Sequence, residues 1–166
     1  MDDWLEEFRT TVEGATEQLA LMSEDRAAIP KAEDKWSPKQ IIGHLIDSAA
    51  NNHQRFVRAQ FTDDMVFPGY EQEAWVRVQR YNDEPWTQLV QLWRLYNLHL
   101  WHVMSAIPEA VRTKSRGSHT LDRIAWQTVS ESEPATLEYF MRDYVAHLRH
   151  HLNQVLLSEP PAVAGG

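Results

Sequence analysis

Apolar residues recur every three or four positions through most of this chain, which is the spacing of one face of an α-helix. Four long runs show this period, at residues 4–22, 37–60, 85–107 and 134–157. Almost no stretch alternates strictly between apolar and polar residues, as a half-buried strand would. The pattern therefore predicts an all-α protein with four long helices.

Helix-terminating and helix-capping residues support these boundaries. Ser37 precedes Pro38, and Gln40 follows the serine by three positions, so the second helix is expected to begin with a capping box. Pro108 ends the third helix, and Pro134 is expected to begin the last one. The helix ends are thus predicted by local chemistry as well as by periodicity.

Two long connections follow the second and third helices, at residues 61–84 and 109–133. Turn-forming pairs such as Pro68-Gly69 interrupt the periodicity there, although short helices are expected at residues 73–80 and 121–129. Connections of this length in a compact domain usually cover something or have a function. We therefore expect a four-helix bundle whose two long connections contribute to a site.

The composition fits one domain over residues 1–166, with a core of about residues 4–157 and a loose tail at 158–166. With 43% hydrophobic residues and seven tryptophans, the chain can build a core without a disulfide or a structural metal. It contains no cysteine. Any bound metal must therefore be held by nitrogen and oxygen ligands.

Charge and hydropathy exclude two classes of partner. The formal net charge of −8 would repel a phosphate backbone, and no cluster of lysine and arginine offers a local exception. The N-terminus is acidic where a signal peptide would be basic, and no apolar run approaches the roughly 20 residues of a membrane span. We expect a cytoplasmic protein that binds neither nucleic acid nor a membrane.

Three histidines are candidate metal ligands. His147 and His151 are four residues apart on the last helix, with His151 inside the apolar stripe and His147 at its edge, whereas His150 points away. His44 lies on one border of the stripe of the second helix. Together they would form a tripodal site. The alternative, which spacing alone leaves open, is that each histidine is packed or hydrogen-bonded at a helix edge.

A polar strip continues from His44 along the same border of its helix. Ser48, Asn51 and Arg55 follow it at spacings of four, seven and eleven residues, so they are candidates to line a pocket, or else an ordinary solvated helix border. Asp47 is the nearest carboxylate, but its wheel position is further from the core than that of His44. We expect a solvated aspartate or a partner to a ligand there, and assign no catalytic residue.

Four motifs together resemble the DinB-like superfamily, and most closely its YfiT-like branch of metal-dependent hydrolases. The resemblance covers about residues 4–157 and rests on the order of these motifs. They are Trp36-Ser37-Pro38, Gly43-His44-Leu45-Ile46-Asp47-Ser48, Gly69-Tyr70-Glu71 ahead of Trp75, and His147-Leu148-Arg149-His150-His151-Leu152-Asn153-Gln154.

The resemblance implies an up-down-down-up four-helix bundle. It also implies that His44, His147 and His151 bind a divalent ion, nickel or zinc. One segment, residues 123–133, has no secure counterpart in the family pattern, which leaves the rim of the pocket undefined.

Three functions are compatible with such a site. The first is a hydrolase that uses metal-activated water on a small-molecule substrate. The second is a metal-dependent transferase that uses a low-molecular-weight thiol, and the third is a stress-related protein that binds a metal or small ligand without catalysis. The tryptophan-rich helices and the resemblance also lead us to expect a homodimer.

Overall fold

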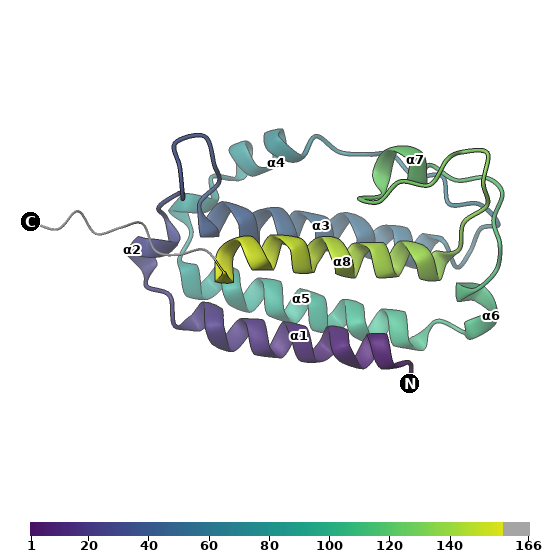
Figure 1. Ribbon diagram of the computed structural model, residues 1–166, viewed down its shortest axis with the longest axis horizontal. Helices are drawn as coiled ribbons and strands as arrows, with labels where there is room; N and C mark the ends of the chain where they lie inside the picture. The colour runs from purple at the N-terminus through teal and green to yellow at the C-terminus, as the bar shows by residue number, and fades with distance from the viewer. Residues whose placement is uncertain (158–166) are drawn as a thin grey trace, which may run out of the picture.

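Four long helices lie side by side in the computed structural model, which describes residues 1–157 (Figure 1). They are α1 (Asp3–Ala20), α3 (Pro38–Arg58), α5 (Trp86–Ala106) and α8 (Leu137–Leu156). Figure 1 shows α1 and α8 running in one direction and α3 and α5 in the other, so the order is up-down-down-up. The predicted all-α bundle is confirmed. The expected loose tail, residues 158–166, lies outside the described residues.

Five short elements complete the described chain. They are α2 (Glu24–Ala27), α4 (Gln72–Gln79), the 3₁₀ turn η1 (Tyr81–Asp83), α6 (Glu109–Arg112) and α7 (Leu121–Ile124). The long connections contain α4 and α7, which both lie on the α3 side of the bundle in Figure 1. No described helix is both long and apolar enough to cross a membrane.

Local chemistry sets the helix boundaries largely as expected. The predicted capping box is present, since the Ser37 side chain accepts from the Gln40 backbone and the Gln40 side chain accepts from the Ser37 backbone. The last helix begins later than Pro134, because Ala135 exchanges two backbone hydrogen bonds with Arg116. Thr136 then caps α8 by accepting a hydrogen bond from the backbone of Tyr139.

The core lies between the four long helices, where each contributes fully buried apolar side chains. Large examples, with relative exposure of 2% or less, are Phe8 and Leu19 of α1, Ile42, Leu45 and Phe56 of α3, Leu89, Trp93 and Leu100 of α5, and Phe140 and Leu148 of α8. They all lie within the four periodic runs, on the helix faces that meet in the core. Their burial is the main stabilising contribution and fixes how the helix faces meet.

The segment after α4 returns to α3, where buried polar contacts hold it. Tyr81 of η1 packs directly on Gly43, and its hydroxyl donates to Asp47 Oδ1 at 2.6 Å. Gln79 also donates to Asp47 Oδ1, at 2.8 Å. The expectation of a solvated Asp47 was wrong, because this side chain is only 3% exposed. Its carboxylate instead holds the α4–η1 connection against the start of α3.

Gly43→Ala is expected to destabilise the protein by about 1–3 kcal/mol, because the added Cβ would overlap the ring of Tyr81, which its bond to Asp47 holds in place. This loss should exceed the gain in helix propensity, about 1 kcal/mol. Urea unfolding measures the difference. Gly14→Ala is the control: Gly14 is exposed on α1 with nothing within 4 Å, so that substitution should stabilise. Equal effects at both positions would contradict the argument.

Candidate metal centre

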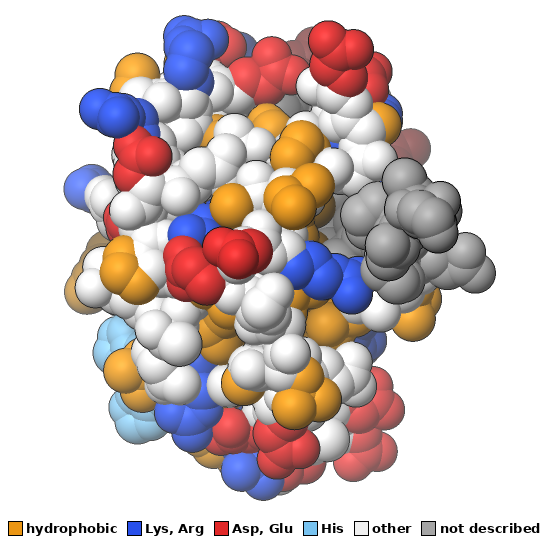
Figure 2. All heavy atoms as spheres, turned by 90° about the vertical axis from the view of Figure 1, so that its left-hand side faces the viewer, with side chains coloured by type: hydrophobic (Ala, Val, Ile, Leu, Met, Phe, Trp, Pro, Cys, Tyr) orange, Lys and Arg blue, Asp and Glu red, His pale blue; other side chains and the backbone are white. Residues whose placement is uncertain are grey.

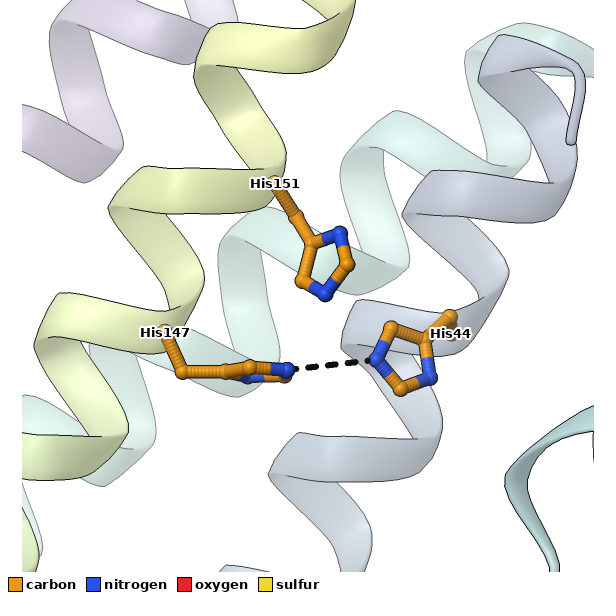
Figure 3. Close-up of side chains that lie close together, drawn as sticks. All are labelled: His44, His147 and His151. Atoms are coloured by element: carbon orange, nitrogen blue, oxygen red, sulfur yellow. Dashed lines mark hydrogen bonds between the residues drawn. The ribbon is translucent and has the colours of Figure 1, made fainter. Parts of the chain in front are cut away.

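The antiparallel contact between α3 and α8 brings the three candidate ligands together. His44 lies in the second turn of α3, and His147 and His151 lie in the second half of α8. Figure 3 shows their imidazole rings converging from the two helices. The Nε2 atoms of His44 and His147 are 3.4 Å apart, and the His151 ring centroid is 4.8 Å from that of His44. Residues separated by more than a hundred positions thus form one cluster.

The spacing of the ring nitrogens suits a metal ion. Each histidine offers one ring nitrogen, and these three atoms lie within 4.8 Å of one another. In a tetrahedral zinc site with Zn–N bonds of about 2.05 Å, the nitrogens are separated by about 3.3 Å. The His44–His147 pair already has this spacing, and the nitrogen of His151 lies a little outside it. The donor set therefore fits a divalent ion held by imidazole nitrogen.

The electrostatic environment keeps the three rings neutral. Burial, with a smaller contribution from nearby histidines, lowers the pKa of His44 to about 4 and that of His147 to about 3. Burial also lowers the pKa of His151. Neutral imidazole is the form that binds a metal, because its second nitrogen keeps a lone pair. At neutral pH these rings can act as ligands without first losing a proton.

A hydrogen bond orients the donor atom of one ring, that of His151. Gln154 Oε1 lies 2.9 Å from His151 Nδ1, which places the proton there and leaves Nε2 directed toward the other two rings (Figure 3). Within residues 1–157, the buried Nδ1 of His44 has no hydrogen-bond partner, while Trp36 packs against that ring at 5.1 Å between centroids. The two Nε2 atoms of His44 and His147 are within hydrogen-bond distance, so one ring can donate to the other, and a cation bound between them would take the place of that proton.

A cavity of about 390 Å³ extends from the histidines along α3 and α8. Of the three predicted lining residues, Ser48 and Arg55 line this cavity, whereas Asn51 does not. The Asn51 amide donates to the Asp47 carbonyl at 2.9 Å, and its side chain lines a separate surface pocket. Asn52 lines the cavity instead, eight positions after His44. A spacing of four, eight and eleven would have identified it from the sequence.

Two segments from the long connections form the rim of the cavity. Tyr70 lines it and packs against Trp75, with ring centroids 5.0 Å apart, and burial raises the pKa of Tyr70 to about 12. On the other side, residues 123–126 line it, and the Trp126 ring lies 6.1 Å from that of His147. The segment that has no secure counterpart in the family pattern thus contributes part of the rim.

Asp143 is a residue that sequence reasoning missed. Its carboxylate accepts hydrogen bonds from the backbone N–H groups of Trp126 and Gln127, both at 2.8 Å, and so holds the rim segment over α8. These two bonds also explain why α7 ends at Ile124 rather than continuing to residue 129 as predicted. The signal in the sequence was a carboxylate beside the apolar stripe of a helix. A buried carboxylate is costly without a hydrogen-bond partner, so its position indicated a partner from another segment.

The remaining histidines lie outside the cluster. His53 contacts the hydroxyl of Tyr96 at 3.1 Å and packs against His99, so this pair belongs to the α3–α5 contact. His119 lies between the Glu133 carbonyl and the Leu121 amide in the second long connection. His150 is exposed and borders the cavity beside Trp126, at 5.2 Å between ring centroids.

The fold and the cluster define a class: a four-helix bundle with a candidate three-histidine metal site at one end. YfiT from Bacillus subtilis, described as "a probable metal-dependent hydrolase with an unusual four-helix bundle topology", matches 93% of this chain and 86% of its own with a TM-score of 0.71. Sequence identity is 17%, so this likeness establishes the fold.

A comparison by sequence agrees with the structural one. A protein of Oceanobacillus iheyensis, named as a candidate metal-dependent hydrolase, is 25% identical over 73 residues. The match spans 44% of this chain and 42% of that relative, which is less than half of either. No family model matches the chain. The two similar proteins bear out the resemblance to YfiT-like proteins of the DinB-like superfamily.

Acidification should destabilise the metal-free protein. The pKa of His44 is lowered from 6.5 to about 4 by folding, so the unfolded chain takes up its proton first. Above pH 6.5, His44 is neutral in both states, so its titration does not change the free energy of unfolding. Between pH 6.5 and about 4, the free energy of unfolding should fall by an amount on the order of 3 kcal/mol. Urea titrations with a chelator present measure it. His44→Gln should reduce that slope, and an unchanged slope in this variant would contradict the assignment.

Proposed function

We propose that this protein is a metal-dependent hydrolase whose ion, zinc or nickel, is bound by His44, His147 and His151. The observation that carries the proposal is the convergence of three neutral ring nitrogens within 4.8 Å of one another beside a polar cavity. The names of both similar proteins support hydrolysis as the reaction class. The substrate on this view is a small molecule that enters the 390 Å³ cavity.

The ion would supply Lewis acidity, which lets water act as a nucleophile near neutral pH without a protein thiol or serine. The protein's own residues bind and orient. Trp36 packs against His44, and Trp126 packs near His147, so both rings are restrained before an ion binds. Tyr70 and residues 123–126 line the cavity, where they would limit the access of bulk water to a bound substrate.

No carboxylate in the cavity is assigned as a catalytic base. Both oxygens of Asp143 already accept backbone N–H groups, so this residue is a positioning residue for the rim. Asp47 accepts from Tyr81 and Gln79, which fixes its carboxylate toward the α4–η1 connection. The catalytic residues proper remain unassigned, and the candidate site consists of the three ligands and the cavity wall.

A thiol-dependent transferase is the alternative function. The specific observation in its favour is the polar wall of the cavity, where Ser48, Asn52 and Arg55 could bind a polar cosubstrate beside the histidines. The third function, binding of a metal or small ligand without catalysis, would use the same histidines and cavity. The three functions differ in what they require: metal and water, metal and an added thiol, or metal alone.

The test combines metal analysis with activity. Wild-type protein purified without a histidine tag should hold about one zinc or nickel ion per chain. His147→Ala and His151→Ala should lose it while retaining helical circular dichroism. His150→Ala is the matched control, because this exposed neighbour does not belong to the cluster and the ion should remain.

Activity then separates the three functions. Metal-dependent cleavage of an ester and amide panel supports hydrolysis if it is lost in His147→Ala and His151→Ala. It should persist in His102→Ala, because His102 is exposed on α5 and does not line the cavity. Turnover that requires an added low-molecular-weight thiol supports the transferase. Metal binding without turnover in either condition supports the binding protein, and a wild type that takes up no divalent ion contradicts the whole proposal.

We also propose that the chain forms a homodimer. Leu92 and Leu95, three residues apart on α5, are 45% and 58% exposed, which leaves apolar surface on an outer helix. Light scattering at micromolar concentration should give twice the chain mass, and Leu95→Glu should lower it toward the monomer. A monomeric mass for the wild type would contradict this proposal.

A further inference from the structure

The cavity is a groove that follows two helices for about three turns. Beyond His44, its α3 wall is formed by Ser48, Asn52 and Arg55, at spacings of four, eight and eleven residues. The α8 wall runs antiparallel, from His151 and His147 to Tyr144 and Phe140. At 1.5 Å per residue, Arg55 lies about 16 Å along the helix axis from His44. The histidines and Arg55 therefore occupy opposite ends of one elongated cavity.

Arg55 is a buried cation at the far end of the groove. It is 6% exposed, and its Nη1 and Nη2 atoms donate to Asn52 Oδ1 at 3.3 Å and to the Pro68 carbonyl at 2.9 Å. These bonds use two of its five N–H groups and so leave three. Among the described residues, no carboxylate lies within 4.0 Å of the Arg55 guanidinium. Its charge is thus held in place but not neutralised.

Two of the three other buried Lys and Arg side chains of the described chain are paired with carboxylates. Lys39 pairs with Glu24, and Arg112 pairs with Asp2 and Glu138. Arg116 donates to several backbone carbonyls and lines no cavity beside the histidines. A buried charge without a counter-charge costs stability, and is retained more readily where a ligand supplies the missing charge. Burial also lowers the pKa of Arg55, in keeping with its lack of an acidic partner.

The groove as a whole favours a negative ligand. Asp143 is the only carboxylate among its lining residues, and backbone N–H groups occupy both of its oxygens. Arg55 and Arg123 are lining cations. The net charge of the lining Asp and Arg side chains is therefore positive, whereas the formal net charge of the whole chain is −8. An anion entering the groove would therefore find an attractive field at its Arg55 end.

We propose that the substrate is an elongated small molecule with an anionic group, a carboxylate or a phosphate, that Arg55 binds at the end of the groove opposite the histidines. The planar guanidinium matches the two oxygens of either group and would fix which part of the molecule reaches the metal end. This inference rests on the proposed function for the identity of the reacting end. The recognition of the anion depends only on Arg55 and the groove.

A ligand with one metal-binding end and one anionic end tests the inference by calorimetry. Suberic acid monohydroxamate is compared with its methyl ester on metal-loaded wild type. The free acid should bind about ten- to a hundredfold more tightly, as expected for charge-assisted hydrogen bonds. The shorter succinic monohydroxamate cannot span the groove, so its free acid and ester should bind alike. A phosphonate of the suberic length shows which anion is preferred.

Variants assign the preference to one residue. Arg55→Gln should bind the suberic acid and its ester equally, and Arg55→Lys should keep part of the difference because it keeps the charge but not the planar fork. Arg58→Gln is the matched control: Arg58 lies one turn further along α3, is exposed and does not line this groove. Circular dichroism and thermal unfolding check that Arg55→Gln is folded; if it is not, Arg55→Lys and the length series still decide.

The outcomes separate this inference from the proposed function. Equal binding of acid and ester to wild type, or an acid preference that survives in Arg55→Gln, overturns the anion site. If neither ligand loses affinity when the metal is removed or in His147→Ala, while the acid preference persists, the anion site stands and the metal site alone is contradicted. Hydroxamate binding that depends on the metal but is equally tight for the acid and the ester contradicts the anion site alone. If neither ligand binds, both proposals are contradicted.

Discussion

The antiparallel contact between α3 and α8 is the constraint on which both the histidine cluster and the groove depend. It places the first turns of α3 beside the last turns of α8, so His44 meets His147 and His151 (Figure 3). The same contact aligns Ser48, Asn52 and Arg55 with Tyr144 and Phe140 as two walls of one groove. The contact is maintained by apolar residues that have no chemical role, such as Phe56, which packs against Phe140 and Tyr144. Core packing therefore positions the polar residues.

Buried carboxylates hold the two long connections on the bundle. Asp47 accepts from Tyr81 and Gln79 of the first connection, and Asp143 accepts from two backbone N–H groups of the second. Each lies on a long helix and reaches one of the two connections, which also bury apolar residues such as Val76 and Leu121. Burying these groups is costly unless they are hydrogen-bonded, so the bonds specify where the connections lie. The rim of the groove is a consequence of these two contacts.

Charge is distributed unevenly between the groove and the outer surface. Figure 2 shows one end of the molecule, where acidic and basic side chains are interspersed with apolar ones. Inside the groove, neutral imidazoles lie at one end and the Arg55 guanidinium at the other. An ion at the histidines would add a second positive centre in low-dielectric surroundings. The chemistry of this protein is thus concentrated on one interhelical surface, while the rest of the bundle supplies stability.

The sequence by itself determined the four long helices, their capping and the faces they bury, because periodicity and end signals such as Ser37-Pro38 are local. It also identified the histidine triple, once its order was compared with a family pattern. Only the tertiary structure decided that Asp47 is buried, that Asn52 rather than Asn51 lines the groove, and that Asp143 fixes the rim. Those outcomes depend on which segments the long connections bring against a helix, and helical periodicity carries no information about a contact between residues far apart in the chain.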